Sequence, residues 1–163
     1  KGQKFDAFAN DTNFLLAAFL FEDVGVTAYK GAAGLITNKT YLDAAAGILA
    51  VEAYHAGAVR TVLYAEAEKN HAIYGIVQKI SDIRDAVDGS SNDDQAIQYG
   101  SDKAWKPKNP SNLVPTDKNG IAYGRTPGHV LNIVYVTPET NATKGGFYPN
   151  GVNGAVNSTS FGN

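Results

Sequence analysis

Apolar residues recur with the period of an α-helix through the first half of the chain. Between about Asp11 and Leu35 this spacing predicts one long helix, with Asp11 or Thr12 as its N-cap. One face carries Leu15, Ala18, Phe19, Glu22, Gly25, Val26, Tyr29 and Ala33, and the other face adds Leu16, Phe21 and Val24. A helix that is apolar nearly all round is expected to be buried on every side.

A second long helix is predicted from about Thr40, whose hydroxyl can cap it, to about Glu68. Its apolar face consists of Ala45, Ile48, Leu49, Glu52, His55, Ala56, Val59 and Leu63. The connecting loop is short, with Gly34 as a stop signal, so the two helices are expected to be antiparallel neighbours. Two such helices cannot bury each other completely, and they need further helices from the same protein or from another copy.

A third helix fits the apolar stripe from about Ile73 to Val87, and Gly89 ends it. Ala, Leu, Ile and Val dominate the chain up to this point, and no proline interrupts it. Residues 1–88 are therefore predicted to form the long helices of a bundle.

Residues 89–163 differ in composition, since Gly, Asn, Pro, Ser and Asp dominate them. This composition is typical of irregular structure. Within it, a Thr-Pro pair predicts the start of a short helix near 126–136. In the tail that follows, Phe147 and Tyr148 are expected to anchor the chain.

Composition narrows the classes of function. The chain has 163 residues, enough for one domain, and a net charge of -2 with no basic patch, so nucleic acid is not an expected partner. No apolar run reaches the roughly 20 residues of a membrane span. The absence of cysteine excludes disulfides, thiolate catalysis and cysteine-based zinc sites. A chain that begins at Lys1 and has no methionine is expected to be a processed form, a fragment or the ordered part of something longer.

Four Asn-x-Ser/Thr triplets occur in places where loops or helix ends are expected. They begin at Asn10, Asn38, Asn141 and Asn157. Such triplets also arise by chance, because Asn, Ser and Thr are common in this chain. Their number and placement favour N-linked glycans, and hence a secreted protein, extracellular or in the cell wall.

Three metal-binding residue types interrupt the apolar faces of the first two helices. Glu22 lies on the first helix, whereas Glu52 and His55 lie one turn apart on the second. Glu-x-x-His on one bundle helix, facing a Glu on another, is half of a carboxylate-bridged dimetal site. Two iron or manganese ions would suit these ligands. In the alternative interpretation, Glu22 pairs with an arginine and His55 is a core histidine with a satisfied hydrogen bond.

The segment from Phe19 to Tyr64 resembles the ferritin-like domain of the desiccation-related proteins of plants, algae, fungi and bacteria. The resemblance rests on FLFEDVGVTAY around Glu22 and AAAGILAVEAYHAGAVRTVLY around Glu52. Downstream, GRTP, NIVY and GGFYPNG are similar to the C-terminal part of plant and algal members.

This resemblance implies an all-α, ferritin-like four-helix bundle, of which the chain contains the last two bundle helices and a largely irregular C-terminal region with short helices. The first two bundle helices, which would bring another Glu and another Glu-x-x-His, are missing. An N-terminal half or another copy is expected to supply them, which makes the protein an oligomer. The resemblance also matches Glu22, Glu52 and His55 to metal-ligand positions, although some plant members have lost ligands there.

Two functions follow from these observations. The composition, the four triplets and the absence of a further catalytic constellation favour a secreted, glycosylated, desiccation- or stress-related protein with a structural or protective role. In this interpretation it has no catalytic residues. The three retained ligands favour a di-iron or di-manganese redox protein, such as a ferroxidase, an oxidase or a peroxide-consuming enzyme.

Overall fold

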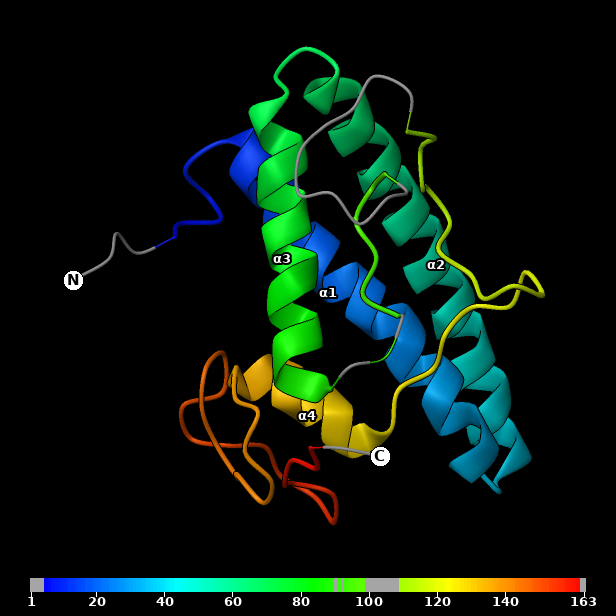
Figure 1. The fold of residues 1–163 in the computed structure, drawn as a ribbon. Helices are drawn as coiled ribbons and strands as arrows, with labels where there is room; N and C mark the ends of the chain where they lie inside the picture. The colour runs from blue at the N-terminus through cyan, green and yellow to red at the C-terminus, as the bar shows by residue number, and fades with distance from the viewer. Residues whose placement is uncertain (1–4, 90, 92, 99–108, 162–163) are drawn as a thin grey trace.

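The computed structural model describes residues 5–89, 91, 93–98 and 109–161, and within them the fold is all-α, as predicted (Figure 1). The helices are α1 (Asp11–Ala32), α2 (Lys39–Ala67), α3 (Ala72–Asp88) and α4 (Pro127–Tyr135), and a 3-10 turn η1 (Ala33–Leu35) follows α1. The first predicted helix therefore ends in a tighter turn over its last three residues. The remaining described residues are loops, in which two isolated β-bridges occur.

The N-caps of the two long helices are asparagines, and the predicted caps were wrong. The Asn10 side chain accepts a hydrogen bond of 2.8 Å from the Asn13 N–H at the start of α1. The Asn38 side chain accepts from two backbone N–H groups at the start of α2. An N-cap must lie just outside the helix with an extended backbone, whereas Asp11 and Thr40 already lie inside their helices.

The predicted start of the fourth helix is confirmed. The Thr126 side chain caps α4 by accepting a 3.3 Å hydrogen bond from the His129 N–H, and proline follows as the first helical residue. Its missing N–H would have no partner at that position in any case.

Helices α1 and α2 form an antiparallel pair, α3 packs on one side of them, and α4 crosses the lower end of α3 (Figure 1). The core lies where α3 meets the pair. It contains Leu16, Phe19, Leu63, Ala67, Ile73, Tyr74, Val77, Ala96 and Ile97. A smaller cluster of Val24, Val87 and Ile133 joins α1 and α3 to α4.

Buried ion pairs connect α1 and α2 to each other and to α3. Asp23 of α1 binds Arg60 of α2 through two hydrogen bonds of 2.9 and 2.7 Å, and Arg84 of α3 through one of 3.0 Å. Both arginines are 1% exposed. Burial raises the pKa of Asp23, but the two arginines outweigh it, so that its pKa lies below the usual range. The carboxylate therefore stays charged and joins three helices.

The arginine of α2 also organises the chain beyond α3. Arg60 donates hydrogen bonds to the carbonyl oxygens of Gln95, Ala96 and Asn112, at 2.6, 3.2 and 2.7 Å. Residues 93–98 and 109–112 thus pack beside α2, although both lack regular secondary structure. Hydrogen bonds to a buried guanidinium replace the missing backbone ladder.

The segment that leads into α4 lies against the end of α1. The Arg125 N–H donates a 2.9 Å hydrogen bond to the Thr27 carbonyl. A Cβ at Gly31 would lie 1.9 Å from the Arg125 carbonyl oxygen, so only glycine permits this approach. In the tail, Phe147 contacts Phe21 edge to face at 4.9 Å and donates a backbone hydrogen bond to Val134.

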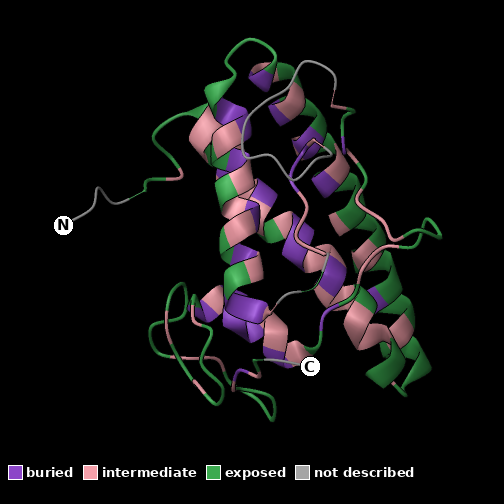
Figure 2. Ribbon diagram, viewed as in Figure 1, coloured by how far each residue is buried: buried purple, intermediate pink, exposed green. Residues whose placement is uncertain are grey.

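Contrary to expectation, the first long helix is not buried on every side within this chain, whereas the incomplete mutual burial of the two long helices was predicted. Residues along α2 are exposed on much of its surface (Figure 2). The exposed large apolar residues of α1 and α2 are Phe14, Phe21, Tyr41, Ile48, Val51, Tyr54 and Val62. Within the described part of the chain, Phe147 contacts Phe21, and the side chains in this list all remain exposed. Among the described residues, no helix combines the length and apolar character needed to cross a membrane.

We expect Asp23→Ala to destabilise the fold by about 3–5 kcal/mol, because it leaves two buried arginines without their carboxylate. Chemical denaturation at neutral pH measures this change. The matched control is Asp43→Ala, which removes an exposed carboxylate from α2 and should change stability by less than about 0.5 kcal/mol. Equal stabilities of the two variants would contradict the role assigned to Asp23.

Candidate metal centre

The structure brings the three predicted metal ligands together. Glu22 projects from α1 toward α2, and its Oε2 lies 3.3 Å from the Nδ1 of His55. Glu22 also lies close enough to Glu52 to raise the pKa of that carboxyl group. Each side chain therefore contacts another member of the group, as a shared site between two helices requires.

Helix geometry explains this convergence. Glu52 and His55 are one turn apart on α2, so both side chains project from the same face. The antiparallel pairing of α1 with α2 places Glu22 opposite that face. Asp23, the next residue of α1, is held by Arg60 and Arg84. Adjacent helical positions point about 100° apart. The ion pairs of Asp23 therefore also orient Glu22.

The carboxyl groups are suited to a cation. Burial raises the pKa of Glu52, Glu22 raises it further through a hydrogen bond and its charge, and His55 lowers it. Two carboxylates at hydrogen-bond distance repel each other unless a proton or a metal ion lies between them. Bridging carboxylates with an imidazole form the donor set that iron and manganese accept. The residues present therefore fit half of a dimetal site.

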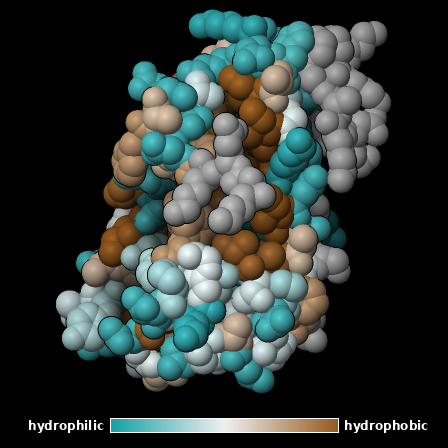
Figure 3. Space-filling model, turned by 90° about the vertical axis from the view of Figure 1, so that its left-hand side faces the viewer, coloured by the Kyte–Doolittle hydropathy of each residue, from teal (hydrophilic) through white to brown (hydrophobic). Residues whose placement is uncertain are grey.

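This half-site is open on one side. The side chain of His55 is 59% exposed and that of Glu22 is 25% exposed. An apolar groove of about 640 Å³ runs along α1 to Glu22, on the face of the molecule shown in Figure 3. Its lining includes Phe14, Phe21, Ile76, Ile80 and Phe147. Three ligands from two helices leave several coordination positions for groups from elsewhere.

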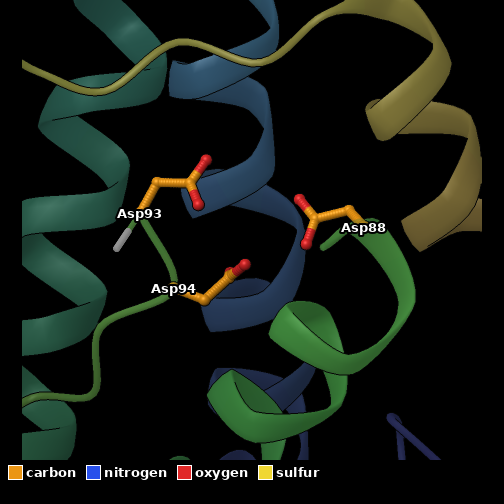
Figure 4. A group of neighbouring side chains, drawn as sticks. All are labelled: Asp88, Asp93 and Asp94. Carbon is orange, nitrogen blue, oxygen red and sulfur yellow. The ribbon is translucent and has the colours of Figure 1, made fainter. Parts of the chain in front are cut away.

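A second group of acidic residues was not predicted from the sequence. Asp88, Asp93 and Asp94 present carboxylate oxygens within 4.8 Å of one another near the end of α3 (Figure 4). Arg125 pairs with all three, at 2.7 Å for Asp88 and 3.4 Å for Asp93, and with Asp94 as well. Arg84 also pairs with Asp94, at 2.7 Å. The guanidinium groups thus occupy the position that a metal ion would take, and the three aspartates form a salt-bridge cluster with the arginines.

No sequence pattern pointed to this cluster. Its acidic residues lie at a helix end and in an irregular segment, where neither helical nor strand periodicity is expected. Arg125, which holds them together, is separated from Asp94 by 31 positions. A tertiary contact of this kind leaves no local signal.

The salt-bridge cluster contains an acid with an unusual proton affinity. Burial raises the pKa of Asp88 to about 7. Arg125 acts against this rise, and the charges of Asp94 and Asp93 add to it. One of its oxygens, Oδ1, is buried without a hydrogen-bond partner. The pKa of this buried carboxyl group therefore lies close to neutral pH.

The four predicted glycosylation sites are all exposed. Asn10 and Asn38 are the N-caps of α1 and α2, and Asn141 and Asn157 lie in the C-terminal tail. The two caps use their side-chain oxygen for the helix. A glycan would be attached to the amide nitrogen, so capping and modification are compatible.

Comparisons with known proteins agree with this geometry. The family described as a ferritin-like domain matches residues 3–65. The desiccation-related protein PCC13-62 of Craterostigma plantagineum is 33% identical over 132 residues, which are 78% of this chain and 42% of the relative. The ferritin-like catalase Nec2 of Nesocodon mauritianus is 26% identical over 157 residues, 93% of this chain and 50% of the relative. No solved structure matches the chain significantly.

The family match identifies a ferritin-like protein. The two antiparallel helices, with carboxyl and imidazole groups in contact between them, agree with this class. Within that class, the chain belongs to the desiccation-related ferritin-like family, and the resemblance drawn from its sequence is confirmed. The relatives support a ferritin-like stress protein. The chain spans about half the length of the curated relatives it matches.

We expect the proton on Asp88 to be visible in the pH dependence of stability. The folded protein holds it up to about pH 7, whereas the unfolded chain releases it near pH 3.8. The unfolded state therefore binds fewer protons between these values, and the contribution of Asp88 to stability falls as the pH rises from about 4 to 7.

Denaturant unfolding of the wild type and Asp88→Asn across this pH range measures the effect. The variant removes the titrating group but keeps the shape of the side chain, so its stability should decline less steeply with pH. Parallel curves for the two proteins would show that Asp88 titrates alike in the folded and unfolded states.

Proposed function

We propose that this ferritin-like stress protein consumes peroxide at a dimetal centre of which Glu22, Glu52 and His55 form one half. The convergence of these three side chains between α1 and α2 carries the proposal. Their retention and contact are what a metal site needs and what a purely structural bundle does not. The similarity to a ferritin-like catalase supports peroxide as the substrate.

Each residue has a distinct task in this proposal. The Glu22 carboxylate contacts the imidazole of His55 and raises the pKa of Glu52, so it would hold metal together with both residues. Glu52 would bind from the second helix, and because its pKa is raised, its affinity for a cation would increase as the pH rises. His55 would bind metal through a ring nitrogen of its neutral imidazole. A bound pair of iron or manganese ions would supply the electron exchange by which two H₂O₂ become two H₂O and one O₂.

The proposal requires a second half for the bundle. The exposed apolar residues on both sides of the three ligands, such as Ile48 and Val62 of α2, would be buried by two further helices. Those helices would bring another Glu and another Glu-x-x-His. They come from an N-terminal half of the protein or from another copy of the chain, and the active particle is then an assembly of both halves.

In the complete protein, we expect Glu52→Gln and His55→Ala to lose bound iron or manganese and to consume peroxide at least about 100-fold more slowly, because each removes a ligand. Metal analysis and the rate of O₂ release measure the two effects. Glu66→Gln, also on α2, is the matched control and should behave as the wild type. Full metal content and full activity in Glu52→Gln would refute the dimetal proposal.

A structural or protective role as a secreted or cell-wall glycoprotein is the second candidate function. It is favoured by the exposure of Asn10, Asn38, Asn141 and Asn157. Glycans at both ends of the helical pair and in the tail would keep the surface hydrated and would limit which faces can associate. This role and a metal centre can exist in one protein.

For this second candidate, we expect the protein purified from its natural source to lose mass when N-glycans are removed enzymatically. Mass spectrometry of the released peptides should place glycans on the four asparagines. Asn119, which is exposed but not followed by the required Ser or Thr, is the internal control. Peptides that carry no glycan at any of the four positions would refute the glycoprotein assignment.

A further inference from the structure

Gly25 lies beside the candidate ligands, one turn after Glu22 on α1. The Glu52 carboxyl group rests against the backbone at this position. A Cβ built on Gly25 would lie 2.3 Å from Oε2, 2.7 Å from Cδ and 3.2 Å from Oε1 of Glu52. Any side chain at Gly25 would therefore occupy the space that the Glu52 carboxyl group takes up.

The backbone gives no reason for a glycine here. Gly25 lies within α1, and it is not among the described glycines with positive φ. Glycine in the interior of a helix is unfavourable relative to alanine, because it gains conformational freedom on unfolding. The other glycine of α1, Gly31, is explained by the close approach of the Arg125 backbone. What distinguishes Gly25 is the carboxyl group beside it.

We propose that Gly25 is a positioning residue, which sets where the Glu52 carboxyl group lies relative to Glu22 and to bound metal. This inference rests on the proposed function, because it assigns Glu52 as a ligand. Without a side chain at Gly25, the carboxyl group can lie close to α1 and reach Glu22. With one, it would have to swing away from α1, and the group of three would separate.

The atoms that would collide explain why such a change affects the site more than the fold. They belong to the end of the Glu52 side chain, which can rotate, and not to the backbone. At Gly31, by contrast, the obstacle is a backbone carbonyl that cannot move without its segment. A methyl group at Gly25 is therefore accommodated by moving one carboxyl group.

Gly25→Ala in the complete protein tests this inference with Mn²⁺ as the probe. We expect the affinity for Mn²⁺, measured by calorimetric titration, to fall by about 10–100-fold, as for other residues that orient a ligand. The melting temperature of the metal-free variant should stay the same or rise by a few degrees, because alanine favours the helix. A merely structural role would lower the melting temperature and would not act on affinity alone.

Gly47→Ala and Gly57→Ala are the matched controls on α2, since a Cβ at either position has no neighbour within 4 Å. Both should bind Mn²⁺ as the wild type does. Wild-type affinity in Gly25→Ala would overturn the inference and would leave the dimetal proposal intact. If the wild type binds neither Mn²⁺ nor Fe²⁺, the proposed function fails instead. Crystal structures of the metal-free proteins then decide on Gly25: a Glu52 carboxyl group in the same place in both would overturn its role.

Discussion

The buried contact of Asp23 with Arg60 and Arg84 is the interaction on which the rest of the structure depends. It joins α1, α2 and α3 at one carboxylate, and through Arg60 it also holds the irregular segments that follow α3. Removing charges from water is costly, and only a complete set of partners compensates for it. The network therefore stabilises the observed rotation of α1 against α2. That rotation turns Glu22, the neighbour of Asp23, toward Glu52 and His55.

The two sides of the helical pair thus have different roles. On one side, α3 and the loops close over an apolar core and a set of paired charges. On the other, acidic and imidazole groups lie among apolar residues that remain exposed. Exposed apolar surface of this extent around convergent ligands is typical of a face that another element covers. In the proposed function, the missing half of the bundle would cover this second face.

The helices and the convergence of the three candidate ligands could be predicted from the sequence because both depend on helical periodicity. Glu22, Glu52 and His55 stood out as polar residues at apolar positions, and the Thr-Pro pair gave the start of α4. Asn10 and Asn38 were not recognised as N-caps, since Asp11 and Thr40 are equally good capping types one or two positions away. The cluster of Asp88, Asp93, Asp94 and Arg125 depends on a contact between distant segments, which no local pattern encodes. The role of Gly25 likewise appears only when the neighbouring side chain is known.

Native mass spectrometry of the complete protein, with metal analysis of the same sample, tests the central claim most directly. The claim is that the face of α1 and α2 that carries Glu22, Glu52 and His55 is half of a dimetal centre. It predicts a particle that contains both halves of the bundle and two iron or manganese ions for each set of four helices. A fully assembled particle that carries no such ions, and takes up none when they are supplied, would contradict it.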